Sequence, residues 1–156
     1  KARAAAERWL KSVPLETQQD RLWRLWGLHV LGGDDETKRA VRAEILAAQR
    51  EDGGWAETLE RASDAYSTGQ TLYMLCRSGT VEQDSASDPV LQRAAAYLLR
   101  TQHADGSWLF VSHVKPVQPY FDNGDPHGKN QFISTAATAW ATAGLAQMLP
   151  SQAAAP

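Results

Sequence analysis

A single cysteine stands in this chain of 156 residues, and neither sign of charge predominates. Cys76 alone allows no disulfide framework, and its place in an apolar helical pattern indicates a small buried side chain rather than a nucleophile or metal ligand. Sixteen Lys and Arg residues oppose eighteen Asp and Glu, for a formal net charge of −2, and no basic run or stripe is present. Nucleic acid is therefore excluded as an expected partner.

Long apolar runs are missing as well. The uncharged stretch from Ile133 to Leu149 is mostly Ala, Thr and Ser, which is too polar for a membrane span. Because it has no charged face, we expect a buried helix packed inside a ring of other helices. No targeting segment is recognisable and the compartment stays open. We expect residues 1–156 to form one soluble domain of a longer parent chain, since the sequence opens at Lys1.

One short sequence pattern occurs twice in the chain. An apolar helix end is followed by Gln, a polar link, Asp-Gly, one small residue and Trp. The first copy runs from Gln49 to Trp55, and the second runs from Gln102 to Trp108, about 53 residues later. A period of this size is typical of repeat proteins.

The residue types in the pattern predict its local structure. Gly53 and Gly106 allow the left-handed backbone that reverses the chain after a helix. Each tryptophan can then fold back over the helix end. The amides of Gln49 and Gln102 have donors and acceptors for unpaired backbone groups on a neighbouring helix. The pattern therefore predicts a corner that fastens each repeat.

These two motifs, Gln49 to Trp55 and Gln102 to Trp108, resemble the QW repeats of squalene-hopene cyclases and related triterpene cyclases. The resemblance extends over roughly Gln18 to Leu149. It implies the fold that this family shares with protein prenyltransferase β subunits, which is a toroid of inner and outer helices. It implies little about catalysis, because QW repeats stiffen the toroid and do not carry the chemistry.

The fold class that we predict is all-α, as a partial α/α toroid of about three antiparallel helical hairpins. Open edges of such a partial ring would be covered by the rest of a parent chain or by a second copy. A polar link is expected at 81–87 and a frayed tail at 151–156. The expected outer helices are Ala2–Lys11, Ala40–Gln49 and Val90–Gln102, and the expected inner helices are Gln18–Leu31, Asp64–Cys76 and about Asn130–Leu149.

The second unit carries an insertion of roughly 14 residues after its tryptophan, in a fold whose links are usually short. Three interpretations stay open: a structural Ω-type loop, a contact for a small molecule or peptide, and a metal site. In the first, Tyr120 and Phe121 would pack the loop onto the helix ends. The metal interpretation lacks a recognisable ligand spacing. The candidate residues of the loop are His113, Tyr120, Phe121, Asp122, Asp125 and His127.

No catalytic residue, cofactor or metal is assigned from the sequence. The cyclase resemblance implies an Asp-x-Asp-Asp motif that protonates an alkene, and the chain has none. The nearest acidic cluster, Asp34 to Glu36, precedes a helix and is expected to cap it. The prenyltransferase resemblance implies zinc held by Asp, Cys and His, but no acidic residue lies just upstream of Cys76.

Two functional hypotheses follow. The first is a non-catalytic repeat scaffold or binding module, using a concave inner face and the loop from Trp108 to Asn130. Its partner would be a protein or an apolar small molecule. The alternative is a fragment of a terpenoid cyclase whose catalytic acid lies elsewhere in the parent chain. Three aromatic residues of the inner face, Trp26, Tyr73 and Trp140, would line an apolar cavity in either case, or would form core.

Overall fold

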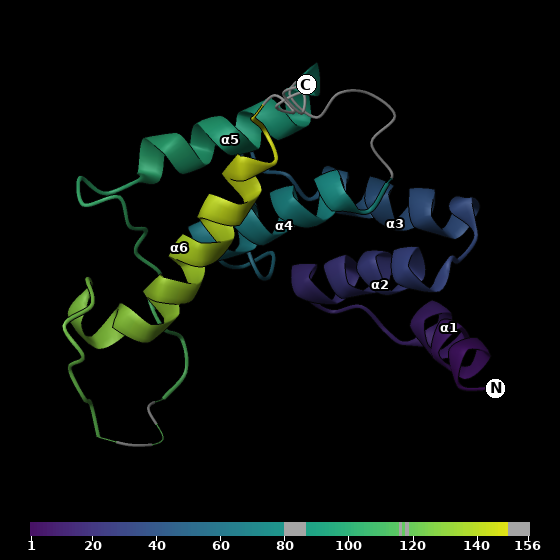
Figure 1. Ribbon diagram of the computed structural model, residues 1–156, viewed down its shortest axis with the longest axis horizontal. Coiled ribbons are helices and arrows are strands. Elements are labelled where there is room, and N and C mark those ends of the chain that lie inside the picture. Colours follow the sequence, from purple (N-terminus) through teal and green to yellow (C-terminus); the bar gives the residue numbers. More distant parts are fainter. Residues whose placement is uncertain (80–86, 116, 118, 150–156) are drawn as a thin grey trace, which may run out of the picture.

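The computed structural model is built from α-helices (Figure 1) and describes residues 1–79, 87–115, 117 and 119–149. Within these residues there is no strand, which confirms the predicted all-α class. Of the predicted link and tail, residues 81–86 and 151–156 lie outside the described part. The elements are α1 (Ala2–Ser12), α2 (Gln18–Leu31), α3 (Asp35–Ala47), α4 (Ala65–Arg77), α5 (Pro89–Thr101), the 3-10 turn η2 (Gly128–Asn130) and α6 (Gln131–Ala146).

Side-chain caps fix where four of the helices begin. Thr17 Oγ1 accepts a hydrogen bond from the Asp20 amide at 3.1 Å, and Asp20 Oδ2 accepts one from the Thr17 amide at 2.8 Å. This reciprocal capping box satisfies two amides at the start of α2. Asp34, Asp64 and Asp88 cap α3, α4 and α5. The acidic cluster before α3 thus starts a helix, as its sequence position predicts.

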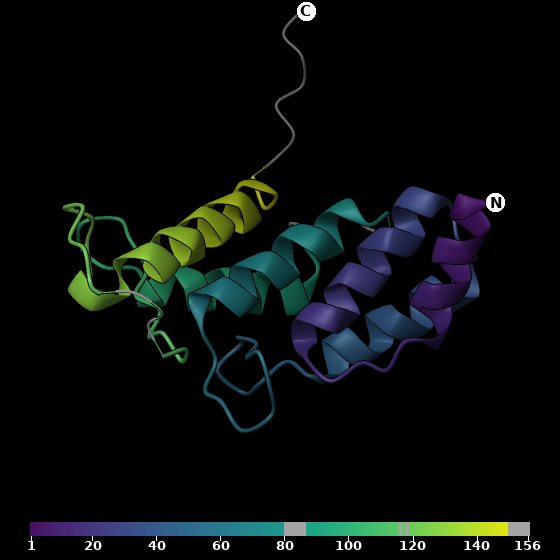
Figure 2. The ribbon, with the colours of Figure 1, turned by 90° about the horizontal axis from the view of Figure 1, so that it is seen from below.

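Three helices, α2, α4 and α6, form one layer in which α4 contacts both of the others (Figure 2). Helices α2 and α4 run in the same direction, and α6 crosses α4 at an angle (Figure 1). Behind this layer, α3 packs on α2, and α5 packs on both α4 and α6. The first helix, α1, contacts α2 and has no buried residue, so Trp9 is 62% exposed. In the described part of the chain, no helix is long and apolar enough to span a membrane.

The closest packing in the layer joins α4 to α6 where both helices carry small residues. A Cβ atom added to Gly69 would lie 2.5 Å from the carbonyl carbon of Trp140 and 2.6 Å from Cα of Ala141. A Cβ added to Gly144 would lie 2.7 Å from the Gly69 oxygen. The two backbones therefore touch, which only glycine permits at these positions.

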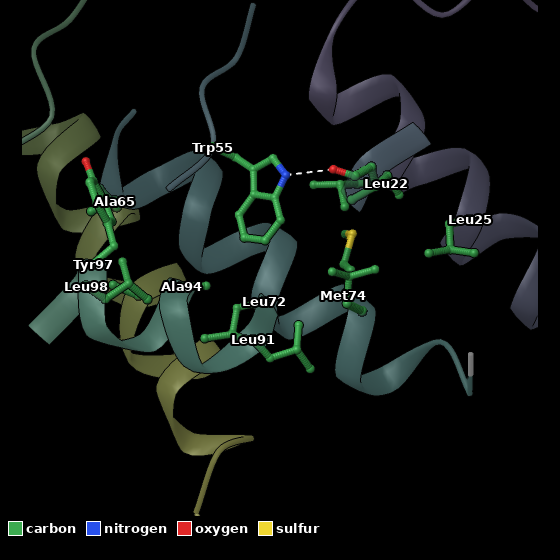
Figure 3. Packing of buried hydrophobic residues seen from close by; sticks show 14 of the residues in the cluster. Leu22, Leu25, Trp55, Ala65, Leu72, Met74, Leu91, Ala94, Tyr97 and Leu98 are labelled. Atoms are coloured by element: carbon green, nitrogen blue, oxygen red, sulfur yellow. Dashed lines mark hydrogen bonds between the residues drawn. The ribbon is translucent and has the colours of Figure 1, made fainter. Parts of the chain in front are cut away.

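The core lies between the two layers. Trp55 points into it (Figure 3), among buried leucines of α2, α4 and α5. The expectation that residues 133–149 are surrounded by other helices is wrong. Ala137, Ala141 and Gly144 are buried against α4, but Thr135, Ala139 and Thr142 on the other face of α6 are exposed. The lack of charge on α6 reflects one face of close contact rather than burial on every face.

Candidate functional site

The two tryptophans close their turns in the same way. The ring nitrogen Nε1 of Trp55 donates a hydrogen bond to the carbonyl oxygen of Ile45 at 2.7 Å (Figure 3). Nε1 of Trp108 donates to the carbonyl oxygen of Leu98 at 2.8 Å. Both indoles are buried, at 0% and 2% exposure. Each ring therefore covers the end of its preceding helix and satisfies a carbonyl there.

The glutamines and glycines of the turns also match. Nε2 of Gln49 donates to the Gly53 oxygen at 3.0 Å, and Nε2 of Gln102 donates to the Gly106 oxygen at 2.9 Å. The two glycines have φ of 89° and 85°, a left-handed backbone that favours glycine. The second copy of the motif thus reproduces the hydrogen bonds of the first.

The turns differ in what covers them. The amide of Gln49 also donates to the carbonyl oxygen of Val90 on α5 at 2.9 Å, and a Cβ on Gly53 would lie 2.5 Å from the Arg93 oxygen. Gln102 is exposed, and a Cβ on Gly106 would meet only the amide of Gln102, at 3.9 Å. Both turns bond the helix that follows, because the Trp55 amide donates to Thr68 Oγ1 at 2.9 Å and the Trp108 amide donates to Thr138 Oγ1 at 3.0 Å. Within the described residues, the first turn is in addition fastened to α5.

The aromatic residues predicted for the inner face form a row across the layer of α2, α4 and α6. The ring centroids of Trp26 and Tyr73 are 6.4 Å apart, and those of Tyr73 and Trp140 are 5.7 Å apart. His29 extends the row at 5.7 Å from Trp26. All three predicted residues are partly buried and pack against the core, so the row is both an edge of the core and an accessible apolar surface.

The loop residues are not gathered into one site. Phe110 and His113 rings are 5.5 Å apart, and His113 is exposed beside the start of the loop. His127 lies at the other end, where Nε2 is 2.8 Å from Oγ of Ser107 and the ring is 4.8 Å from that of His103. Its φ of 77° is rare for a side-chain-bearing residue. His127 thus ties the loop to the second tryptophan turn.

One buried glutamine holds the middle of the loop. Nε2 of Gln131 donates to the Tyr120 hydroxyl at 3.1 Å and to the Phe121 oxygen at 2.9 Å, while its Oε1 accepts from the Asn123 amide at 3.1 Å. The prediction that both rings pack the loop onto the helix ends is wrong for Phe121, whose side chain is 70% exposed. Its backbone, rather than its ring, makes the attachment.

The two loop aspartates satisfy their own turn. Oδ1 of Asp122 accepts from the Gly124 amide at 2.9 Å, and Oδ2 of Asp125 accepts from Nδ2 of Asn123 at 2.7 Å. The first is an ordinary Asx-turn contact, and the second joins two side chains of the same turn. Across residues 1–79, 87–115, 117 and 119–149, no group of three or more His, Cys, Asp and Glu residues is arranged to hold a metal ion.

A cavity of about 320 Å³ opens where α2, α4 and α6 begin and where the loop passes over them. Its walls combine apolar and aromatic side chains with several polar groups. Tyr66 contacts Phe110 at a centroid distance of 5.8 Å, so the loop closes one side of it. The lining residues are Gln18, Gln19, Leu22, Glu57, Tyr66, Ser67, Gln70, Phe110, Ser112, His113, Val114 and Ile133.

Two amides in this cavity have atoms without hydrogen-bond partners among the described residues. Gln70 is 1% exposed, and neither its Oε1 nor its Nε2 is paired. Oε1 of Gln18, which is also buried, is unpaired, while its Nε2 donates to Thr71 Oγ1 at 3.4 Å. Neither residue is predicted as a site residue from the sequence. The available signal was a glutamine at Gln70 inside a cluster of small residues on an otherwise apolar helix.

Asp64, which caps α4, has a buried carboxyl group, and burial disfavours its charged form. Burial raises its pKa, and this effect outweighs the hydrogen bonds from the Ser67 amide and hydroxyl that stabilise the charged form. At the second turn the opposite holds, because hydrogen bonds from Ser107 lower the pKa of Asp105.

The raised pKa predicts how stability depends on pH. Because the folded pKa of Asp64 lies above the unfolded value of about 3.9, the protonated group favours the folded state. Its contribution is complete below the unfolded pKa and is lost as pH rises through the folded pKa. Wild type should therefore lose stability relative to Asp64→Asn, which retains a capping side chain, as pH rises above about 3.9. Thermal unfolding of both proteins measures this, and a difference independent of pH would contradict it.

Comparison of the chain with protein-family models, with curated proteins and with solved structures finds no match in any of the three. Function is therefore inferred from the geometry of the cavity, the aromatic row and the two turns.

Proposed function

We propose that this chain is a non-catalytic helical-repeat module, related to the squalene-cyclase and prenyltransferase folds, that binds a small molecule in the cavity at the start of α2, α4 and α6. The repeated hydrogen bonds of the two tryptophan turns support the relation. The cavity itself carries the proposal of binding.

The size and walls of the cavity support a small ligand. Its volume of about 320 Å³ lies at the lower end of the range of roughly 300–1,000 Å³ that is usual for ligand pockets. Leu22, Phe110 and Ile133 provide apolar wall on separate elements, so a ligand would be enclosed from α2, the loop and α6. A peptide would need a longer groove than this.

A substitution that fills the cavity should abolish binding. We expect Ile133→Trp to weaken binding of phenylacetamide and of its isosteric hydrocarbon, isobutylbenzene, by at least about tenfold, because the indole would occupy the cavity. Saturation-transfer NMR with each probe measures the binding. The matched control is Phe132→Trp, since Phe132 is the adjacent residue on α6 and does not line the cavity. Equal binding by both variants, or no binding of either probe to wild type, would refute the proposal.

The second hypothesis, a fragment of a terpenoid cyclase, has one observation in its favour. The row of Trp26, Tyr73 and Trp140 presents π faces that stabilise positive charge. A parent sequence with an Asp-x-Asp-Asp motif outside these residues would favour this hypothesis over the binding module, and unrelated flanking modules would count against it.

A further inference from the structure

We propose that the cavity recognises a primary carboxamide, and that Gln70 and Gln18 are the side chains that recognise it. This inference rests on the proposed function, because it names the chemistry of the ligand that the cavity would bind. It depends on the unpaired amide atoms, whereas the proposed function depends on the shape of the cavity.

A hydrogen-bonding ligand would stabilise the unpaired amide of Gln70. A buried amide that loses its hydrogen bonds to water without gaining others destabilises the fold, so such groups are rare in native proteins. This chain satisfies a comparable residue elsewhere, because Gln131 is 0% exposed and uses both ends of its amide to hold the loop. Gln70 lines a cavity instead. Its Oε1 and Nε2 are both buried, so the amide must turn about its soft terminal torsion to reach a ligand in the cavity.

The set of unpaired atoms defines the complementary group. Gln70 presents one acceptor, Oε1, and one donor group, Nε2, and Gln18 adds a second acceptor, Oε1. A primary carboxamide has two N–H donors and one carbonyl acceptor. Its N–H groups can donate to Oε1 of Gln70 and Oε1 of Gln18, while its oxygen accepts from Nε2 of Gln70. All three unpaired positions are then satisfied by a single functional group.

Charged groups fit this set less well. A carboxylate has only acceptors and would face the two glutamine oxygens without a proton between them. Glu57, on the wall of the same cavity, would repel it further. An ammonium group has only donors and would leave Nε2 of Gln70 unpaired. The apolar walls at Leu22 and Phe110 suit an aryl or alkyl body attached to the carboxamide.

Three probes of similar shape test the inference: phenylacetamide, phenylacetate and isobutylbenzene. Titration calorimetry gives the affinity of each for wild type and for Gln70→Leu, which replaces the amide by an apolar group of similar size. The comparison uses the ratio of amide to hydrocarbon affinity, because the hydration of each free probe then cancels between the two proteins. We expect Gln70→Leu to shift this ratio toward the hydrocarbon by about tenfold or more, and wild type to bind phenylacetate more weakly than phenylacetamide.

The control is Gln147→Leu, at the other end of α6, where the glutamine bonds the Ala143 oxygen and does not line the cavity. This variant should retain the ratio of wild type. If Gln70→Leu does not fold, Gln18→Leu takes its place. The side-chain amide signal of Gln70 in wild type should also move with phenylacetamide and not with isobutylbenzene.

The outcomes separate the two proposals. If both neutral probes bind and the ratio is unchanged by Gln70→Leu, the cavity binds ligands but the carboxamide inference is wrong. Phenylacetate binding as tightly as phenylacetamide would overturn it too. If neither neutral probe binds to wild type, the inference and the proposed function both fail.

Discussion

Replacing Trp55 by alanine is expected to lower the free energy of unfolding by about 3–5 kcal/mol. The indole is fully buried in the core between the helix layers, so its removal leaves a large cavity. The carbonyl oxygen of Ile45 also loses the donor that satisfies it at 2.7 Å. Guanidinium denaturation followed by far-UV circular dichroism measures the loss, because that signal depends on helix content rather than on the tryptophan that is removed.

Trp55→Phe serves as the control that separates packing from hydrogen bonding. Phenylalanine retains much of the apolar volume but has no ring N–H, so we expect a smaller loss of about 1–3 kcal/mol. A loss below about 1 kcal/mol for Trp55→Ala would show that this ring does not hold the repeat together.

Gly69→Ala is expected to destabilise the protein by about 3 kcal/mol, although alanine favours a helix over glycine by about 1 kcal/mol. The added methyl group would meet backbone atoms of Trp140 and Ala141 at 2.5 and 2.6 Å, so α4 and α6 must separate. Backbone cannot rotate away as a side chain does. The change is measured as a shift in the guanidinium midpoint at constant slope.

The matched control is Gly27→Ala in the interior of α2. There the added methyl group would meet Cδ1 of Leu10 at 2.7 Å, which is the tip of a flexible side chain on α1. Leu10 can rotate, so we expect stability within about 0.5 kcal/mol of wild type. Equal effects of the two substitutions would mean that the contact between α4 and α6 yields as easily as a side chain.

Local signals in the sequence predicted the helices well, because the groups that start and stop a helix are close in sequence. Asp88 followed by Pro89 placed the start of α5 correctly, and Gly32 ends α2 with φ of 65°. The end of α3 was placed two residues late, at Gln49 rather than Ala47. Gln49 belongs instead to the turn, where its amide bonds Gly53.

The candidate site was predicted less completely, because its parts meet only through distant contacts. The sequence identified Trp26, Tyr73 and Trp140 as one set, since each lies on a predicted inner helix, and the structure brings their rings together. It did not identify Gln70, because glutamine in a helix is unremarkable until burial and partners are known. The meeting of His127 with Ser107 spans 20 residues and has no local signal.

The unequal covering of the two tryptophan turns predicts which of the two opens more easily. Corresponding hydrogen bonds in the two turns have similar lengths. The Gly53 amide donates to the Arg50 oxygen at 3.0 Å, and the Gly106 amide donates to the His103 oxygen at 2.9 Å. Local opening depends on neighbours as well as on bond length, and only the first turn has α5 against it. The free energy of local opening is therefore lower at the second turn than at the first. Two copies of one motif, with the same internal bonds, therefore differ in local stability because only one of them is held by a further helix.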